Sequence, residues 1–121
     1  MHYKLTYPSW NKKEINAIKK VLKSGYLTMG KNVNLFEKKF AKYLNRKFAV
    51  MVNSGSSANL LGLASLFYKK NKPLKRNDEV IVPAIAWSTT YSPMQQFGLK
   101  LKIVDVDLKD LNVDINKVIS A

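Results

Sequence analysis

Residues 53–59 combine a glycine with several hydroxyl side chains at the point where an apolar run gives way to a helical pattern. The segment contains Gly55 together with Ser54, Ser56 and Ser57. A helix that begins here presents free backbone N–H groups and the positive end of its dipole, and the hydroxyls add hydrogen bonds without charge. The pattern predicts a site for an anion such as a phosphate group. The alternative is a simple helix N-cap, which the same residues favour.

This turn differs from the two familiar glycine-rich phosphate loops. It lacks the lysine of a Walker loop and the second and third glycines of a Gly-x-Gly-x-x-Gly turn. Gly55 would let the backbone come close to a ligand, and Ser56 and Ser57 would add side-chain hydrogen bonds. The turn by itself therefore indicates only that an anion could bind here.

Trp87 follows a second apolar run, residues 79–83. Open parallel sheets bind ligands beyond the carboxyl ends of their strands, so Trp87 would lie beside the first turn if the two strands are neighbours. A flat heteroaromatic ring held by a phosphate could then stack on this side chain. The alternative is a tryptophan buried in the core. Together, the two loops suit a phosphorylated aromatic cofactor better than either does alone.

Two acidic residues, Asp105 and Asp107, follow a third apolar run. Alternation along a strand would send both side chains to one face, where they could bind a cation or a ligand hydroxyl. Residues of this kind more often stabilise the following turn, so no catalytic role is assigned to them.

The elements that position these residues are predicted from periodicity. Helices are expected at about 12–23 and 33–45, the first with Asn11 and Glu14 as a capping box and Gly25 as its stop. A βαβαβ order is expected over about 47–106, with strands at 48–52, 79–83 and 101–106. The helix after Ser57 is apolar nearly all round and is expected to be largely buried. These elements predict an α/β fold with a mostly parallel sheet.

Composition narrows the function classes. The chain has no cysteine and one histidine, His2, so no His/Cys metal cluster is expected. The formal charge of +13 raises nucleic acid as a partner. Eight lysines, however, fall on the polar faces of the first two predicted helices, and no nucleic-acid motif accompanies them. A small basic nucleic-acid-binding domain therefore stays only as an alternative.

Two windows, residues 48–68 and 80–99, contain no charged residue. Each is about as long as a membrane-spanning helix, but both hold too many polar residues for lipid, and no membrane role is expected. The first residues lack the apolar core of a signal peptide, which predicts a cytoplasmic protein. The last residues begin another helix without a stop signal, so further sequence is expected beyond Ala121.

Five segments in order resemble the DegT/StrS-type family of sugar aminotransferases that depend on pyridoxal phosphate (PLP). They are Ser24-Gly25 with Thr28-Met29-Gly30, Phe36-Glu37 with Phe40-Ala41, VNSGSSANLL at 52–61, DEVIVPAIAWSTT at 78–90 and GLKLKIVDVD at 98–107. Residues 28–33 and 87–107 resemble in particular the branch that contains GDP-4-keto-6-deoxy-D-mannose 3-dehydratase.

The resemblance implies the N-terminal part of a fold type I, aspartate-aminotransferase-like large domain, and a homodimer with active sites at the subunit interface. It implies that Gly55, Ser56 and Ser57 bind the PLP phosphate and that Trp87 stacks on the pyridine ring. Residues 26–30 would lie near the sugar. No catalytic residue is assigned in this chain, because the Schiff-base lysine, or the histidine that replaces it, is expected downstream.

The resemblance also implies the reaction class, in the biosynthesis of deoxysugars and cell-surface polysaccharides. With a lysine downstream, an amino group would pass from a donor such as glutamate to a nucleotide-linked keto-sugar through the pyridoxamine phosphate form. With a histidine, the enzyme would be a 4-keto-6-deoxy-sugar 3-dehydratase. The chain alone is expected to be inactive, and a truncated remnant is the further alternative.

Overall fold

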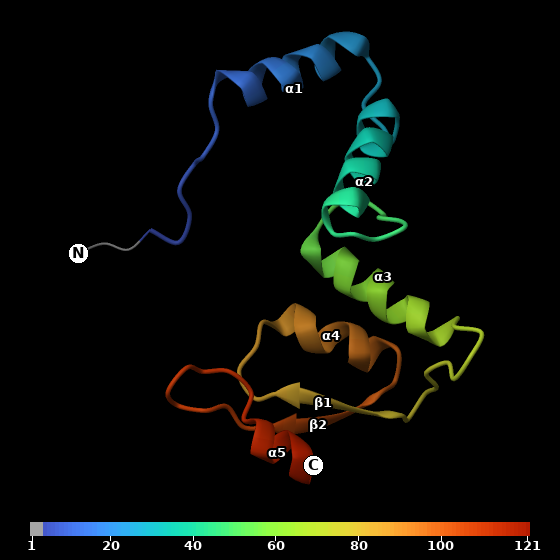
Figure 1. Cartoon of the computed structure of the whole chain (residues 1–121), viewed down its shortest axis with the longest axis vertical. Helices are drawn as coiled ribbons and strands as arrows, with labels where there is room; N and C mark the ends of the chain where they lie inside the picture. Colours follow the sequence, from blue (N-terminus) through green and yellow to red (C-terminus); the bar gives the residue numbers. More distant parts are fainter. Residues whose placement is uncertain (1–3) are drawn as a thin grey trace. The chain divides into compact units, whose positions relative to one another are not determined.

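The computed structural model describes residues 4–121, which form two compact units divided between Met51 and Val52 (Figure 1). Each unit is considered by itself. His2, on which the metal expectation depends, lies outside the described residues. The element order is two helices in the first unit, followed in the second by a helix, a strand, a helix, a strand and a short helix.

The first helix, α1 (Lys12–Ser24), is delimited by local hydrogen bonds. The side chain of Asn11 accepts a hydrogen bond from the Lys13 N–H at 2.8 Å, and the Glu14 carboxylate accepts one from the Asn11 N–H at 2.7 Å. At the other end Gly25 adopts φ 65°, a left-handed conformation that a glycine reaches without steric cost, and donates to the Leu22 carbonyl. Both ends follow from residues close in sequence.

The second helix, α2 (Lys31–Tyr43), begins two residues before the predicted start. The preceding turn depends on Gly30, because a Cβ at that position would collide with the ring of Tyr26. The Tyr26 hydroxyl donates to the Met29 carbonyl at 3.3 Å, so the ring closes over the turn. The turn therefore needs a residue without a side chain at position 30.

Residues 48–52 form no strand, so the strand predicted there is wrong for this structure. Phe48 is 76% exposed, and the backbone N–H of Met51 donates to the Glu37 carboxylate at 2.8 Å instead of to a neighbouring strand. An apolar run becomes a strand only where another strand supplies its ladder of hydrogen bonds.

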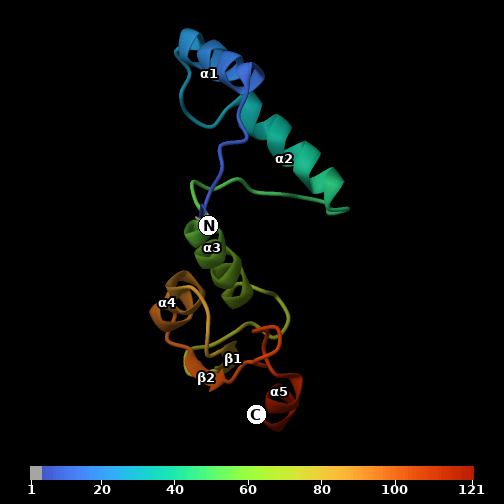
Figure 2. The same ribbon diagram turned by 90° about the vertical axis from the view of Figure 1, so that its left-hand side faces the viewer.

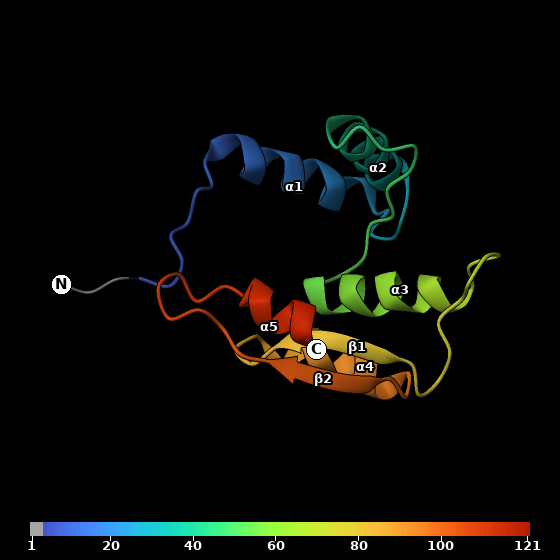
Figure 3. The same ribbon diagram turned by 60° about the horizontal axis from the view of Figure 1, so that its bottom comes forward.

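The sheet of the second unit consists of β1 (Glu79–Pro83) and β2 (Lys100–Val104), which pair in parallel from Glu79 opposite Lys100 to Pro83 opposite Val104. Between them α4 (Ser88–Gln96) covers one face, and α5 (Ile115–Ser120) lies on the other side of the strand pair (Figures 1 and 2). The two strands run side by side (Figure 3). The β–α–β order predicted for residues 79–106 is therefore present, with the second of these strands ending at Val104.

The core of the second unit is small. Val82 is 1% exposed, and Leu99, Val104, Val106 and Pro93 are the other buried side chains. Burying one such side chain contributes on the order of 1.5–3 kcal/mol. The helix α3 (Gly55–Phe67) packs against α4 and has no buried residue, so the expectation that it is largely buried is wrong here. A helix that is apolar all round stays exposed where only one neighbour covers it.

Among residues 4–121, no helix has the length and apolar character that crossing a membrane requires.

A candidate anion site at two helix N-termini

The helix α3 begins with Ser54 as its N-cap. Ser54 has an extended backbone (φ −159°, ψ 163°), and its hydroxyl oxygen accepts a hydrogen bond from the Ser57 N–H at 3.1 Å. The Ser54 hydroxyl also donates to the Ser57 hydroxyl at 3.1 Å. Ser54 is therefore the N-cap residue of α3. The cap binds only one of the free N–H groups at this helix end, so an anion could still bind to the others.

Two backbone donors remain available at this helix end. Gly55 and Ser56 occupy the first two helical positions, whose N–H groups have no partner within a helix. A side chain at position 55 would meet no other atom of the chain within 4 Å, so the space beside Gly55 is open. The turn thus presents the two amides and the Ser56 hydroxyl to an approaching ligand.

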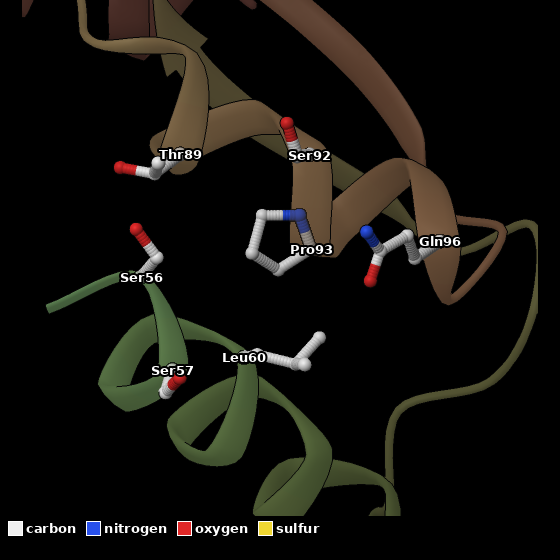
Figure 4. Close-up of a pocket in the computed structure, with 7 residues that line it drawn as sticks. All are labelled: Ser56, Ser57, Leu60, Thr89, Ser92, Pro93 and Gln96. Atoms are coloured by element: carbon white, nitrogen blue, oxygen red, sulfur yellow. The ribbon is translucent and has the colours of Figure 1, made fainter. Parts of the chain in front are cut away.

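The N-terminus of α4 lies next to this turn. The side-chain amide of Asn59, in the second turn of α3, donates to the backbone carbonyl of Thr89, in the first turn of α4, at 3.3 Å. In Figure 4 Ser56 on α3 lies across from Thr89 on α4. Two helix N-termini, each with the positive end of its dipole, therefore meet at one place.

A cavity of about 160 Å³ lies between the two helices (Figure 4). Its lining consists of Ser56, Ser57, Leu60, Thr89, Ser92, Pro93 and Gln96. Pockets for whole organic ligands are larger, on the order of 300–1,000 Å³. The cavity has room for a phosphate-sized group, and a ring attached to that group would have to be held by residues outside it.

Trp87, two residues before Thr89 of the cavity lining, is the candidate for holding such a ring. It is the N-cap residue of α4, with an extended backbone (φ −69°, ψ 145°), and it makes no side-chain cap hydrogen bond. Its side chain is 77% exposed, so in this structure it is not a core residue, contrary to the alternative considered from sequence. An exposed indole at the start of α4 is available for stacking.

The electrostatics of the site come from backbone groups. No charged side chain lines the cavity, and neither α3 nor α4 has an acidic residue in its first turn. Lysines and carboxylates are also missing from the flanking windows 48–68 and 80–99. An anion would therefore bind here through amides, hydroxyls and helix dipoles, without a formal counter-charge.

Asp105 and Asp107 are used by the turn that follows β2. The Asp105 carboxylate accepts from the Val106 N–H and pairs with the Lys117 ammonium, each at 2.9 Å, and Asp107 accepts from the Lys109 N–H at 2.9 Å. The hydrogen bond from Lys117 lowers the pKa of Asp105 below its ordinary range, and the same bond raises the pKa of Lys117. The turn-stabilising role is thus the one seen. No group of three metal-ligating residues occurs among residues 4–121.

The sequence predicts Gly55, Ser56, Ser57 and Trp87 as site residues, and the structure adds the contact between Asn59 and Thr89. Asn59 closes the serine-rich segment, and its amide could have been marked as a donor that reaches another element. In the sequence Thr89 stands out only as part of the segment 78–90 that resembles the family. Its carbonyl becomes a partner for Asn59 through the packing of α3 on α4, which no local pattern reveals.

Comparison with known proteins places these features in a wider group. The DegT/DnrJ/EryC1/StrS aminotransferase family matches residues 8–121. GDP-4-keto-6-deoxy-D-mannose 3-dehydratase of Yersinia pseudotuberculosis is 50% identical over 121 residues, which are 100% of this chain and 31% of that protein. The chain therefore spans about a third of this relative's length.

Solved structures agree with the fold. A crystal structure of GDP-4-keto-6-deoxymannose-3-dehydratase with a trapped PLP-glutamate geminal diamine is 50% identical, has a TM-score of 0.93, and is matched over 99% of this chain and 31% of its own. The PLP form of the sugar aminotransferase Spr1654 from Streptococcus pneumoniae is 26% identical, with a TM-score of 0.83, over 98% of this chain and 29% of its own.

The chain thus shares the fold of the matched part of these enzymes. The chain belongs to the DegT/DnrJ/EryC1/StrS aminotransferase family.

Proposed function

We propose that this chain supplies the phosphate-holding part of a PLP-dependent enzyme that modifies nucleotide-linked keto-sugars. The observation that carries the proposal is the meeting of the α3 and α4 N-termini, with free amides at Gly55 and Ser56 and an exposed indole, Trp87, directly before α4. The family match over residues 8–121 supports the same assignment.

The residues present fit the cofactor's phosphate. The amides of Gly55 and Ser56 and the hydroxyls of Ser56 and Ser57 supply donors, and a cavity of about 160 Å³ adjoins them. No carboxylate would repel the phosphate, because no acidic residue lies in the first turn of either helix. Ser57 would donate through its hydroxyl, since its N–H already binds Ser54.

Trp87 would hold the ring of the cofactor. Its place one residue before α4 puts it at the carboxyl end of β1, where ligands of open parallel sheets bind. Stacking of a pyridine ring on an indole face is worth about 0.5–1.5 kcal/mol beyond the buried area. The phosphate and the ring would thus be held by separate elements, α3 and the loop before α4.

When bound, PLP supplies an electron sink for transfer of an amino group or for loss of a hydroxyl group. The residues of this chain would bind and orient the cofactor, and none of them would move a proton. The cavity lining and Trp87 include no titratable side chain. The catalytic base, a lysine or a histidine, would come from outside residues 1–121.

The two reactions considered from sequence both remain within the proposal. Relatives include a GDP-4-keto-6-deoxymannose-3-dehydratase crystallised with PLP and glutamate, and a sugar aminotransferase crystallised with PLP. We favour the 3-dehydratase, because that relative is 50% identical and the aminotransferase 26%. A nucleotide-linked keto-sugar as substrate, glutamate as amino donor, a homodimer and a cytoplasmic location belong to the same proposal.

The proposal is tested by binding of pyridoxamine 5′-phosphate, measured by titration calorimetry. This form of the cofactor has no aldehyde, so it cannot react with the many surface lysines. We expect binding that is lost when pyridoxamine without phosphate is used and weakened by Ser57→Ala and by Trp87→Ala. Equal binding of both compounds, or unchanged affinity in both variants, would exclude the assignment.

A further inference from the structure

The hydrogen bond between Asn59 and Thr89 has a specific cause in the sequence of α4. In an α-helix the carbonyl of residue 89 accepts from the N–H of residue 93, but residue 93 is Pro93, which has no N–H. The Thr89 carbonyl therefore lacks its intrahelical partner. The side-chain amide of Asn59, 30 residues away in the chain, donates to this oxygen at 3.3 Å.

Pro93 takes part in the same contact through its ring. It is the buried residue of α4, and it lines the cavities on the α3 side of this helix together with Leu60 and Asn59. A proline here thus removes one donor inside α4 and fills the space between the helices. Asn59 supplies the missing donor from α3, and the hydrogen bond joins the second turn of α3 to the first turn of α4.

The segment with Trp87 lies between this hydrogen bond and a second one. The Tyr91 hydroxyl donates to the Pro83 carbonyl at the end of β1 at 2.6 Å, and the Thr90 N–H donates to the Trp87 carbonyl at 2.9 Å. Tyr91 and Thr90 are near Trp87 in sequence. The hydrogen bond from Asn59 connects this segment to α3, the helix that begins at the turn Gly55–Ser57.

We propose that Asn59 is a positioning residue that holds Trp87 at a fixed place relative to the phosphate turn, using the Thr89 carbonyl that Pro93 leaves free. The inference rests on the proposed function, in which Trp87 and the turn bind two parts of one cofactor. Asn59 itself does not touch the cofactor. It sets the spacing of the two groups that do.

The test separates ring-dependent from phosphate-only binding. Asn59→Leu keeps the size of the side chain and removes the donor. We expect it to weaken binding of pyridoxamine 5′-phosphate about three- to tenfold, the range for one hydrogen bond, and to leave binding of inorganic phosphate unchanged. In a Trp87→Ala background the same substitution should have no further effect, because the two residues act as a unit.

A control variant and a second measurement accompany the test. Asn116→Ala changes an exposed asparagine of α5, on the other side of the strand pair from α4, and should not alter the binding of either ligand. In a ligand-free chain with Trp10→Phe, Trp87 is the only tryptophan. Asn59→Leu should then lower the fluorescence anisotropy of Trp87, which reports its local motion.

The outcomes distinguish the two proposals. Loss of anisotropy without any binding of pyridoxamine 5′-phosphate to the parent chain would support the positioning role and exclude the proposed function. Normal cofactor binding with the same affinity in Asn59→Leu and Asn116→Ala would overturn the positioning role alone. An equal loss of phosphate and pyridoxamine 5′-phosphate binding in Asn59→Leu would also overturn it, because the turn itself would then have been damaged.

Discussion

At the scale of single residues, the three serines at the start of α3 have different roles. The Ser54 hydroxyl accepts a hydrogen bond from the Ser57 N–H and caps the helix, whereas Ser56 lines the cavity. In sequence the three are equivalent members of one motif. Their separate roles follow from the backbone, because only Ser54 is extended and lies before the first helical residue.

The first residue-scale prediction concerns Ser54. Replacing it with alanine removes the acceptor for the Ser57 N–H, so Ser54→Ala should lower the free energy of unfolding by about 1 kcal/mol. Urea denaturation followed by circular dichroism measures the change. Ser56→Ala is the matched control and should stay within about 0.5 kcal/mol of the parent chain. An equal effect of the two substitutions would contradict the assigned cap.

A second prediction concerns the ion pair of Asp105 and Lys117, whose side chains are 62% and 50% exposed. The lowered pKa of Asp105 means that its contribution is present above its ordinary pKa of 3.8 and is lost as pH falls through the lower folded value. The raised pKa of Lys117 means that its contribution is present below 10.5 and is lost as pH rises through the higher folded value.

The pair should therefore add a small, constant stability between about pH 4 and pH 10. The difference in unfolding free energy between the parent chain and Lys117→Met, measured at several pH values, should disappear in strong acid and in strong base. Lys109→Met is the control, since Asp105–Lys117 is the only ion pair within residues 4–121. A difference that persists unchanged below pH 2 would show that the ion pair is not its source.

At the scale of elements, two features of the second unit depend on proline and on pairing. In α4 Pro93 removes one hydrogen bond, yet the helix continues from Ser88 to Gln96, because Asn59 satisfies the freed carbonyl. Residues 48–52 have as apolar a sequence as β1 but lack a strand beside them and remain irregular. Each backbone polar group requires a hydrogen-bond partner. This requirement is met in α4, which stays helical, and is not met by a neighbouring strand at residues 48–52, which form no strand.

At the scale of the whole molecule, many large apolar side chains are exposed and the buried core is small. Exposed examples occur on helices of both units, including Leu22, Phe36 and Leu61, whereas the most buried side chain is a valine. Where such side chains form a contiguous patch on one unit, that patch marks a region of contact with other protein. The relatives are about three times as long as this chain.

The prediction at this scale is that residues 1–121 alone have no turnover. The site has donors for a phosphate and a platform for a ring, but no titratable group that could form a bond with a substrate or move a proton. The purified chain with added PLP, glutamate and a nucleotide-linked 4-keto-6-deoxy sugar should give no aminated or 3-deoxy product by chromatography. Product formed above a control without protein would contradict the assignment of the catalytic group to another segment.

The sequence by itself determined the features that depend on neighbours three or four residues away. These include the capping box of Asn11 and Glu14, the stop at Gly25 and the start of α3 after Ser54. The parallel order of β1 and β2 also followed, because the apolar runs and the helix between them allow few topologies.

Only the tertiary structure decided how the turn relates to the rest of the site. In the tertiary structure Asn59 donates to Thr89 and Asp105 pairs with Lys117. Trp87 is exposed, and residues 48–52 form no strand. The reason is that each of these outcomes depends on a partner distant in the chain, and residue spacing determines local geometry but not which distant groups meet.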